Sequence, residues 1–341
     1  MVAGARQPVL EGKVEISQSA IGHGTLGNMV GDGVLSPFLG RLPFDGHPAI
    51  VQGGTMSGAP RLRRVPDPAA LVDLGRYPVL DPTGAGAPVI VHHAAELQKH
   101  GVSILPGFLR DDVLAALVEE SDILAAGAHR QDVQSTPYLE VPDPEAWPVD
   151  HPRRAWARSS VHTVAYDRFS AATSGLRALF EWDALVGFVS RLLGRAPLYR
   201  YADPLGAMNL TVMHEGDTLG WHFDQTDFVV SLALQPSDGG GEFQNVPRLR
   251  GEVREEADEH YDTVGRVLAG EAPELITTIP MTPGTLMVFA GRGSLHRVTP
   301  VQGPTARLVV LFGYDTKEGT MSSDVLKEIR YGRRHPEGAR G

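Results

Sequence analysis

Short runs of β-branched and aromatic residues, separated by turn residues, dominate the second half of the chain. They cover residues 207–215, 227–235, 285–290 and 307–314, with Gly, Pro and Asp between them. β-branched and aromatic side chains fit a pleated and half-buried surface, and the residues between them favour turns. The pattern predicts short strands of an antiparallel β fold.

Apolar residues recur at helical spacing upstream of these runs. Residues 111–127 begin with Asp111 as a candidate N-cap, and residues 169–194 form a second helical stretch. Residues 89–109 read as a strand or loop, a helix and a buried strand, whereas residues 131–158 carry several prolines and read as a long loop. Helices followed by strands predict an α+β fold, with a β-sandwich or jelly-roll barrel packed by N-terminal helices.

The first 87 residues differ from the rest because they are rich in Gly and Pro and weakly periodic. We expect residues 1–87 to form an arm or cap, with short strands at 14–17 and 48–52, and residues 88–341 to form the main domain. A helical insertion is expected at about 252–270. The sequence GHGTLG (22–27) matches a dinucleotide-binding pattern, but the Gly- and Pro-containing residues after it do not predict the helix that such a site needs.

Composition narrows the chemistry. The chain has 341 residues, a formal net charge of -10 and no cysteine. The acidic balance argues against a nucleic-acid partner, which needs a clustered basic surface. Without thiolates, any metal site must use His, Asp, Glu or carbonyl oxygens, which suits iron(II), manganese or a catalytic zinc. No secretory signal or membrane-spanning run is visible, so a cytoplasmic protein without membrane contact is expected.

One pair of candidate metal ligands lies just before a predicted strand. In WHFDQ (221–225), His222 and Asp224 are two residues apart. In an extended chain such residues share a face at a spacing of about 6.6 Å. The best candidate for a third ligand is His296, at the end of a later strand. Two His and one carboxylate would leave three metal positions open, two for a 2-oxo acid and one for O2.

Arg307 strengthens this interpretation. It follows His296 by eleven residues, across a turn at 302–305. A hairpin there would place the guanidinium inside the barrel near the metal, where a buried Arg needs an anionic partner. The distal carboxylate of 2-oxoglutarate fits, because Arg binds carboxylates in a bidentate manner. By contrast, His260 and Asp262 repeat the spacing inside a predicted helix, where they would point about 200° apart.

The pattern His222-Phe223-Asp224, His296 and Arg307 resembles the iron(II)/2-oxoglutarate-dependent dioxygenases. Residues 88–335 are similar to a bacterial subgroup of amino-acid hydroxylases and halogenases, in segments such as GGGEFQNVPRLR and IRYGR. The resemblance implies a double-stranded β-helix, an Fe(II) cofactor, 2-oxoglutarate and O2 as co-substrates, and release of succinate. Halogenating members carry a small residue in place of the ligand Asp. The presence of Asp224 therefore favours hydroxylation of an amino acid or an amino-acid-like metabolite, with desaturation and ring closure left open.

Weaker assignments concern the remaining polar groups. Asn209 lies on the predicted strand before His222 and Asp224, where it could donate a hydrogen bond to 2-oxoglutarate. A purely structural role is equally consistent with its position. Four residues are candidate substrate contacts, against ordinary surface or capping roles: Arg158, His162, Asp203 and Gln225. Arg158 would hold a substrate carboxylate and Asp203 an amino group.

Two other classes of protein stay open. A cupin-like metal enzyme that does not use 2-oxoglutarate would need no Arg307, and a non-catalytic binding module would need no intact set of ligands. The expected partner is a small molecule, and the sequence also allows a homodimer.

Overall fold

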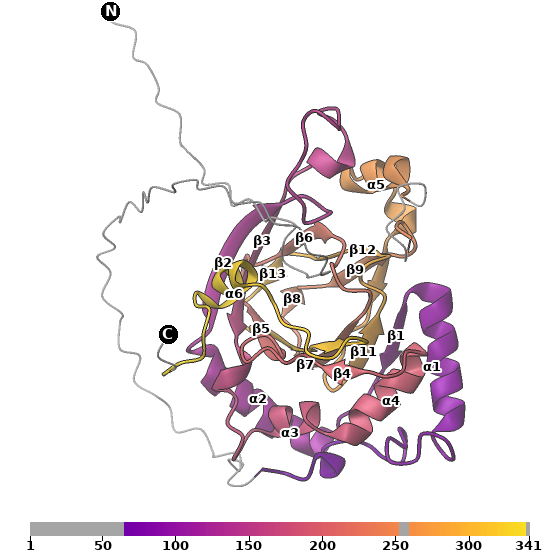
Figure 1. Cartoon of the computed structure of the whole chain (residues 1–341), viewed down its shortest axis with the longest axis vertical. Coiled ribbons are helices and arrows are strands. Elements are labelled where there is room, and N and C mark those ends of the chain that lie inside the picture. Colours follow the sequence, from indigo (N-terminus) through magenta and orange to yellow (C-terminus); the bar gives the residue numbers. More distant parts are fainter. Residues whose placement is uncertain (1–64, 252–258, 339–341) are drawn as a thin grey trace, which may run out of the picture.

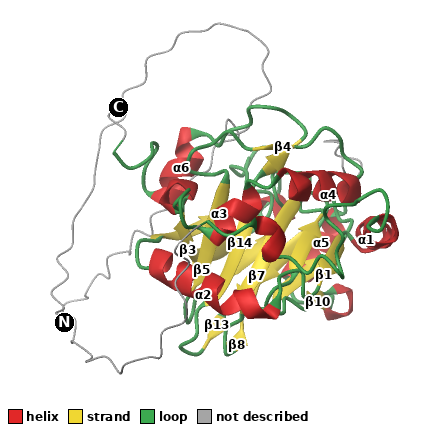
Figure 2. Cartoon of the chain, turned by 90° about the horizontal axis from the view of Figure 1, so that it is seen from below, coloured by secondary structure: helices red, strands yellow, loops and turns green. Residues whose placement is uncertain are grey.

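Two antiparallel sheets face each other and form the body of the molecule. The computed structural model describes residues 65–251 and 259–338, and every structural statement below concerns these residues. Figure 1 looks along the barrel between the sheets, and Figure 2 shows the helices that lie against one of them. The predicted strands at 14–17 and 48–52 and the GHGTLG sequence lie outside the described residues.

The larger sheet has seven strands. In spatial order they are β1 (Val102–Leu105), β11 (Leu286–Phe289), β7 (Val229–Gln235), β14 (Arg307–Phe312), β5 (Met208–Met213), β3 (Ala157–Val164) and β2 (His129–Ser135). The smaller sheet has four: β10 (Thr277–Ile279), β9 (Phe243–Val246), β12 (Leu295–Val298) and β6 (Leu219–His222). Two short pairs join β13 (Val301–Gln302) to β8 (Gly239–Gly240) and β15 (Tyr314–Asp315) to β4 (Tyr199–Arg200).

The path of the chain identifies the architecture. Apart from the short strands β8 and β13, which pair with each other, the chain from β5 to β14 has eight strands, and it passes from one of the two sheets to the other after every strand except β9, which β10 follows in the same sheet. Eight strands arranged in this way form a jelly roll, also called a double-stranded β-helix. The predicted α+β fold with a jelly-roll core is confirmed.

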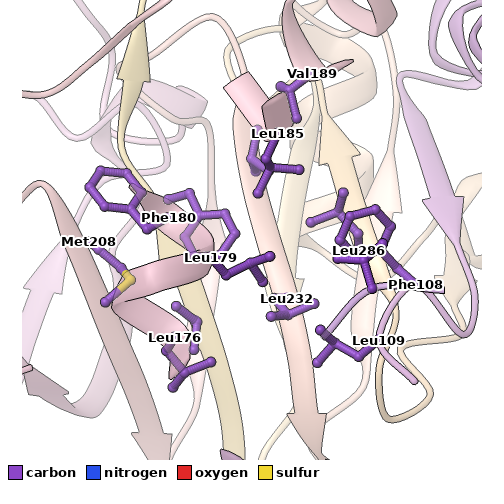
Figure 3. Packing of buried hydrophobic residues seen from close by; sticks show 14 of the residues in the cluster. Phe108, Leu109, Leu176, Leu179, Phe180, Leu185, Val189, Met208, Leu232 and Leu286 are labelled. Atoms are coloured by element: carbon purple, nitrogen blue, oxygen red, sulfur yellow. The ribbon is translucent and has the colours of Figure 1, made fainter. Parts of the chain in front are cut away.

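Helices cover the outer face of the seven-stranded sheet. They are α1 (Ala87–His100), α2 (Asp111–Ala125), α3 (Gly175–Phe180) and α4 (Asp183–Leu193), while α5 (Tyr261–Leu268) and α6 (Asp324–Tyr331) lie elsewhere. Figure 3 shows how Leu179 and Leu185 of α3 and α4 pack toward Leu232 of β7. Alternate residues of β5, β7, β11 and β14 belong to this core, and this is the pattern expected when one sheet face is buried under helices.

The other face of the same strands points into the barrel and is different in character. Asn209, Thr211 and Met213 alternate with the core residues of β5, and Ser231 does so on β7. Since successive side chains of a strand point to opposite faces, these residues line the interior. The seven-stranded sheet thus separates an aliphatic core from a partly polar interior.

Several local predictions need correction. Residues 89–93 are not a strand or loop, because α1 already begins at Ala87, with Pro88 in its first turn, where a proline is tolerated. Residues 131–158 are not wholly a loop, since β2 and the start of β3 fall within them. β2 has the polar sequence HRQDVQS and is held by pairing with β3 along its length, so its composition gave no strand signal.

The boundary of the N-terminal arm is only partly described. Leu71, Val72 and Tyr77 are buried in the same core as α1 to α4, so residues 65–86 pack with the main domain. The division at residue 87 stays a prediction for the residues before 65. The helical insertion expected at 252–270 is described from residue 259 and contains α5. No helix in the described ranges is long and apolar enough to cross a membrane.

The helix-facing core makes a prediction for stability. Leu232→Ala removes a side chain that is 0% exposed, and we expect the free energy of unfolding to fall by about 3 kcal/mol, through lost burial and the cavity left behind. Denaturant unfolding measures this. Leu80→Ala is the control, because Leu80 is 61% exposed and should change stability by less than about 0.5 kcal/mol. Equal effects of the two variants would contradict this account of the core.

Candidate metal and co-substrate site

Three side chains predicted as metal ligands meet inside the barrel. His222 is the last residue of β6, Asp224 follows it by two residues, and His296 lies on β12. β6 and β12 pair with His222 directly opposite His296. One ligand atom from each of the three residues lies within 4.8 Å of the other two. The fold therefore brings together residues that are 74 positions apart in the sequence.

Backbone carbonyls orient both imidazoles. His222 Nδ1 lies 2.8 Å from the Gly220 carbonyl oxygen, and His296 Nδ1 lies 3.0 Å from that of Ser294. Because a carbonyl oxygen can only accept, each Nδ1 carries the proton and each Nε2 keeps a free lone pair. The two Nε2 atoms lie 3.7 and 3.5 Å from the carboxylate oxygens of Asp224. This orientation is the one that metal-binding histidines normally adopt.

Burial also keeps His296 neutral. Desolvation lowers the pKa of His296 to about 4, with the neighbouring His222 as a further cause and Asp224 opposing it. A neutral imidazole is the form that binds metal. Two imidazoles and one carboxylate that converge on a shared point match the set of ligands of non-heme iron(II) oxygenases, so the residues fit such an ion.

The segment that carries Asp224 is held from both sides. Phe223 N–H donates to the Pro137 carbonyl at 2.7 Å, and Asp224 N–H donates to the Gly291 carbonyl at 3.1 Å. Phe223 is fully buried and packs against the ring of Tyr138. Asp224 therefore lies after the end of β6 but has a fixed backbone.

A partly buried ion cluster holds the loop that contains Pro137 and Tyr138. Arg153 donates to Glu140 and, at 2.9 Å, to the hydroxyl of Tyr261 on α5. Arg250 Nε donates to Glu259 at 2.9 Å, and the same carboxylate lies 3.5 Å from Arg153. Charges that are removed from water must be paired in this way. The cluster ties three distant segments together beside the metal motif.

Arg307 is buried at the start of β14 and has no acidic partner among the described residues. Its guanidinium contacts Met213 Sδ at 3.9 Å across the β14–β5 pair. Desolvation lowers the pKa of Arg307 to about 10, which still leaves the side chain cationic at neutral pH. A cavity of about 180 Å³ lies beside it, with Ser237, Glu242 and Thr278 in its wall. A buried cation beside a small cavity is a ready binding site for an anion.

Asn209 also faces the barrel interior. It is 5% exposed and lies opposite Leu311 of β14, and its Oδ1 accepts a long hydrogen bond from Thr211 at 3.5 Å. It lies four positions before Met213 on β5, or about 13 Å along the strand. Asn209 and Arg307 therefore lie at different depths of the barrel.

The structure does not bring Arg158 and His162 to the metal. Both lie on the face of β3 opposite to Val161, which belongs to the interior cluster. Arg158 is exposed and forms a bidentate pair with Asp132 at 2.6 and 2.8 Å. His162 Nδ1 lies 3.3 Å from the Asp217 carboxylate. Because successive side chains of a strand point to opposite faces, the inward position of Val161 puts both of these residues on the outer face.

Asp203 and Gln225 have structural partners. Asp203 is 1% exposed and accepts from the N–H groups of Leu205 and Ser322, both at 2.9 Å, so it ties the loop before β5 to the segment before α6. Gln225 Nε2 donates to the Tyr138 carbonyl at 2.8 Å. Its amide is therefore engaged with the loop described above, although the residue adjoins Asp224.

The second His-x-Asp sequence forms no such group. His260 is the N-cap of α5 and Asp262 lies in its first turn, and the described residues hold one cluster of potential metal ligands, that of His222. Arg297, next to His296, lies over the ring of Trp221 at 4.6 Å and donates to Gln244. It points away from the metal, as the alternation of a strand requires.

A residue that the sequence did not single out lies beside the metal ligands. Asn245 on β9 is directly opposite His296, is 1% exposed, and its Oδ1 has no hydrogen-bond partner among the described residues. It lines a cavity of about 760 Å³ that is bounded by α1, β1 and β10, with Val102, Ile279 and Glu96 in its wall. Asn245 follows Phe243 by two residues and therefore shares its inward face, but only the pairing of β9 with β12 places it beside His296.

The chain was also compared with known protein families and solved structures. A family model described as Halogenase D matches residues 145–330. No curated protein matches the chain. A solved oxidoreductase of the 2OG-Fe(II) oxygenase family from Burkholderia pseudomallei is 17% identical, with a TM-score of 0.41, and the match covers 68% of this chain and 92% of that one.

Two further solved structures are similar at the same level. The non-heme alpha ketoglutarate dependent epimerase SnoN from nogalamycin biosynthesis is 15% identical, with a TM-score of 0.45 and coverage of 67% and 83%. A Pseudomonas putida prolyl-4-hydroxylase is 14% identical, with a TM-score of 0.37 and coverage of 65% and 96%. The family match spans more than half of the sequence and includes His222, Asp224, His296 and Arg307, so the chain belongs to the Halogenase D family and is an iron- and 2-oxoglutarate-dependent dioxygenase.

Proposed function

We propose that this enzyme hydroxylates an unactivated C–H bond of a small amino acid or amino-acid-like metabolite, in the cytoplasm. The reaction is coupled to decarboxylation of 2-oxoglutarate to succinate. His222, Asp224 and His296 are the proposed ligands of Fe(II), which supplies O2 activation when it is bound. The observation that carries the proposal is the set of three convergent ligand atoms with an intact carboxylate.

The carboxylate favours hydroxylation over halogenation, although the family is named after a halogenase. Three protein ligands would leave three positions on a six-coordinate ion. A chelating 2-oxo acid would need two of these and O2 one. With the carboxylate of Asp224 as the third protein ligand, the residues present would leave no position for a halide ion. A residue without a carboxylate at position 224 would leave a coordination position for the halide, but this chain has Asp there.

Arg307 supports 2-oxoglutarate as the co-substrate. Its guanidinium is cationic and buried, and the cavity beside it is of the size of a five-carbon diacid. We assign the distal carboxylate of 2-oxoglutarate to Arg307, as a bidentate charge-assisted pair. Asn209, at another depth of the barrel, is proposed to contact the carboxylate at the metal-bound end. These two contacts would fix both ends of the molecule.

The larger cavity beside Asn245 is proposed to receive the organic substrate. Its wall is mostly apolar, with Val102, Ile104 and Ile279 in it, and Asn245 offers a free acceptor next to His296. A buried acceptor without a partner is unfavourable, so a bound molecule that donates an N–H or O–H would satisfy it. This arrangement suits a small molecule with a hydrocarbon portion and a polar hydrogen-bond donor.

The first prediction tests the metal ligands. His222→Ala removes one of three ligands, so Fe(II) binding under argon and succinate formation from 2-oxoglutarate and O2 should both fall below detection. His260→Ala is the matched control from the second His-x-Asp sequence, and it should leave both unchanged. Full iron binding by His222→Ala would rule out this metal site. Iron binding by the unaltered enzyme without any succinate formation would instead favour a metal enzyme that does not use 2-oxoglutarate.

The second prediction concerns Arg307. Arg307→Gln removes the charge and the fork of donors, and we expect the dissociation constant for 2-oxoglutarate to rise by about 100-fold, with Fe(II) affinity kept. Arg307→Lys keeps the charge without the fork and should weaken binding by about tenfold. Anaerobic titration with 2-oxoglutarate measures both. Arg297→Gln is the control, since Arg297 lies over Trp221 and should not matter.

The third prediction separates substrate from co-substrate. Free amino acids and their N-acyl and carrier-bound forms are screened for succinate formation, and kcat/KM of the best substrate is compared in Asn245→Ala. Loss of one hydrogen bond should lower kcat/KM by about tenfold, while the affinity for 2-oxoglutarate is unchanged. A weaker affinity for 2-oxoglutarate with an unchanged kcat/KM for the substrate would instead assign Asn245 to the co-substrate.

A further inference from the structure

Gly291 lies against the carboxylate of Asp224 and leaves no space for a side chain of its own. A Cβ atom added at Gly291 would stand 2.0 Å from Asp224 Oδ2, 2.8 Å from its Cγ and 2.9 Å from its Cβ. The Gly291 carbonyl also accepts the hydrogen bond from Asp224 N–H. Gly291 is in the turn between β11 and β12, 67 residues from Asp224 in the sequence.

The backbone of Gly291 does not itself require glycine. Twelve described glycines have a positive φ, a conformation that side chains disfavour, and Gly291 is not one of them. Any L-residue could adopt its backbone conformation. The carboxylate of Asp224 is the obstacle, so the need for glycine at 291 arises from the proposed metal ligand.

The obstacle is a side chain that can rotate. If a methyl group were present at 291, a turn of Asp224 about its χ1 angle would relieve the two shortest contacts, those with Oδ2 and Cγ, while the backbone N–H stayed bonded to the Gly291 carbonyl. The contact with Asp224 Cβ at 2.9 Å would remain, and a backbone shift of a few tenths of an ångström would relieve it. Because the turn carries both carboxylate oxygens away from the Nε2 atoms of His222 and His296, we expect the substitution to affect the metal site more than the fold.

We propose that Gly291 is a positioning residue that admits the carboxylate of residue 224 to the metal. Residues 224 and 291 act as a pair: a carboxylate at 224 needs glycine at 291, and a side chain at 291 turns the carboxylate out and opens a coordination position. Gly291 is not a catalytic residue, because it acts through the carboxylate of Asp224. The proposal rests on the proposed iron site. It means that a residue outside the His222-Phe223-Asp224 sequence also decides whether the metal has a carboxylate ligand or an open position for a halide.

A double-mutant cycle tests the pair. Dissociation constants for Fe(II) are measured under argon for the unaltered enzyme, Gly291→Ala, Asp224→Gly and the double variant. We expect Gly291→Ala and Asp224→Gly each to weaken Fe(II) binding by about tenfold or more. In the Asp224→Gly background the added methyl group meets no carboxylate, so the double variant should match Asp224→Gly within about twofold. Gly187→Ala is the control, because a Cβ there meets nothing within 4 Å.

A spectroscopic readout reports the coordination directly. The visible absorption of the Co(II)-loaded protein should change on addition of chloride in Gly291→Ala and Asp224→Gly, and should not change in the unaltered enzyme. The melting temperature of metal-free Gly291→Ala should stay within about 3 °C of that of the unaltered protein.

Each outcome has a separate meaning. Unaltered Fe(II) affinity in Gly291→Ala, with normal binding by the parent enzyme, would overturn the pairing and leave the proposed function intact. Additive losses in the double variant, or a large fall in melting temperature, would show that Gly291 serves the fold and not Asp224. Failure of the parent enzyme to bind Fe(II) would overturn the proposed metal site and this inference together.

Discussion

The pairing of β6 with β12 is the interaction on which the site depends. It places His222 directly opposite His296, and residues paired in this way have Cα atoms only about 4.5–5.5 Å apart. Their neighbours Trp221 and Leu295 point to the outer face and pack in a separate apolar cluster. A slip of one residue would exchange the two faces of a strand, moving an imidazole out of the barrel and an apolar side chain in. Burial of the apolar cluster therefore fixes the register that the metal site requires.

The two faces of the seven-stranded sheet have different roles. The helix-facing side chains of β5, β7, β11 and β14 form the main aliphatic core, while the interior face holds Asn209, Ser231 and the buried guanidinium of Arg307. Arg307 has no acidic partner among the residues that the structure describes, and a buried cation in that state is unfavourable. Apolar burial on the opposite face stabilises the fold that holds it, and under the proposed function this charge selects an anionic co-substrate.

The surroundings of Asp224 show how a residue beyond the end of a strand can be placed with accuracy. The carbonyls of Pro137 and Gly291 fix the backbone of Phe223 and Asp224 from opposite sides, and the ion cluster of Arg153 and Arg250 holds the first of these segments. Preorganisation of this kind is what a metal site needs from its supporting residues. It also explains why a glycine with an ordinary backbone conformation lies beside the carboxylate.

The sequence by itself predicted the jelly-roll fold, and it was sufficient to propose His222, Asp224 and His296 as metal ligands and Arg307 as the residue that binds 2-oxoglutarate. Strand alternation, turn residues and the spacing of ligand types are local properties, and they can be read before the chain folds. It did not reveal β2, whose polar sequence forms a strand only because β3 pairs with it, and it offered Arg158 and His162, which β3 turns to the outer face. Only the tertiary structure decided which residues lie beside the proposed metal ligands, among them Asn245 next to His296 and Gly291 next to Asp224. Their importance lies in contacts with segments dozens of residues away, and such contacts exist only once the two sheets have closed against each other.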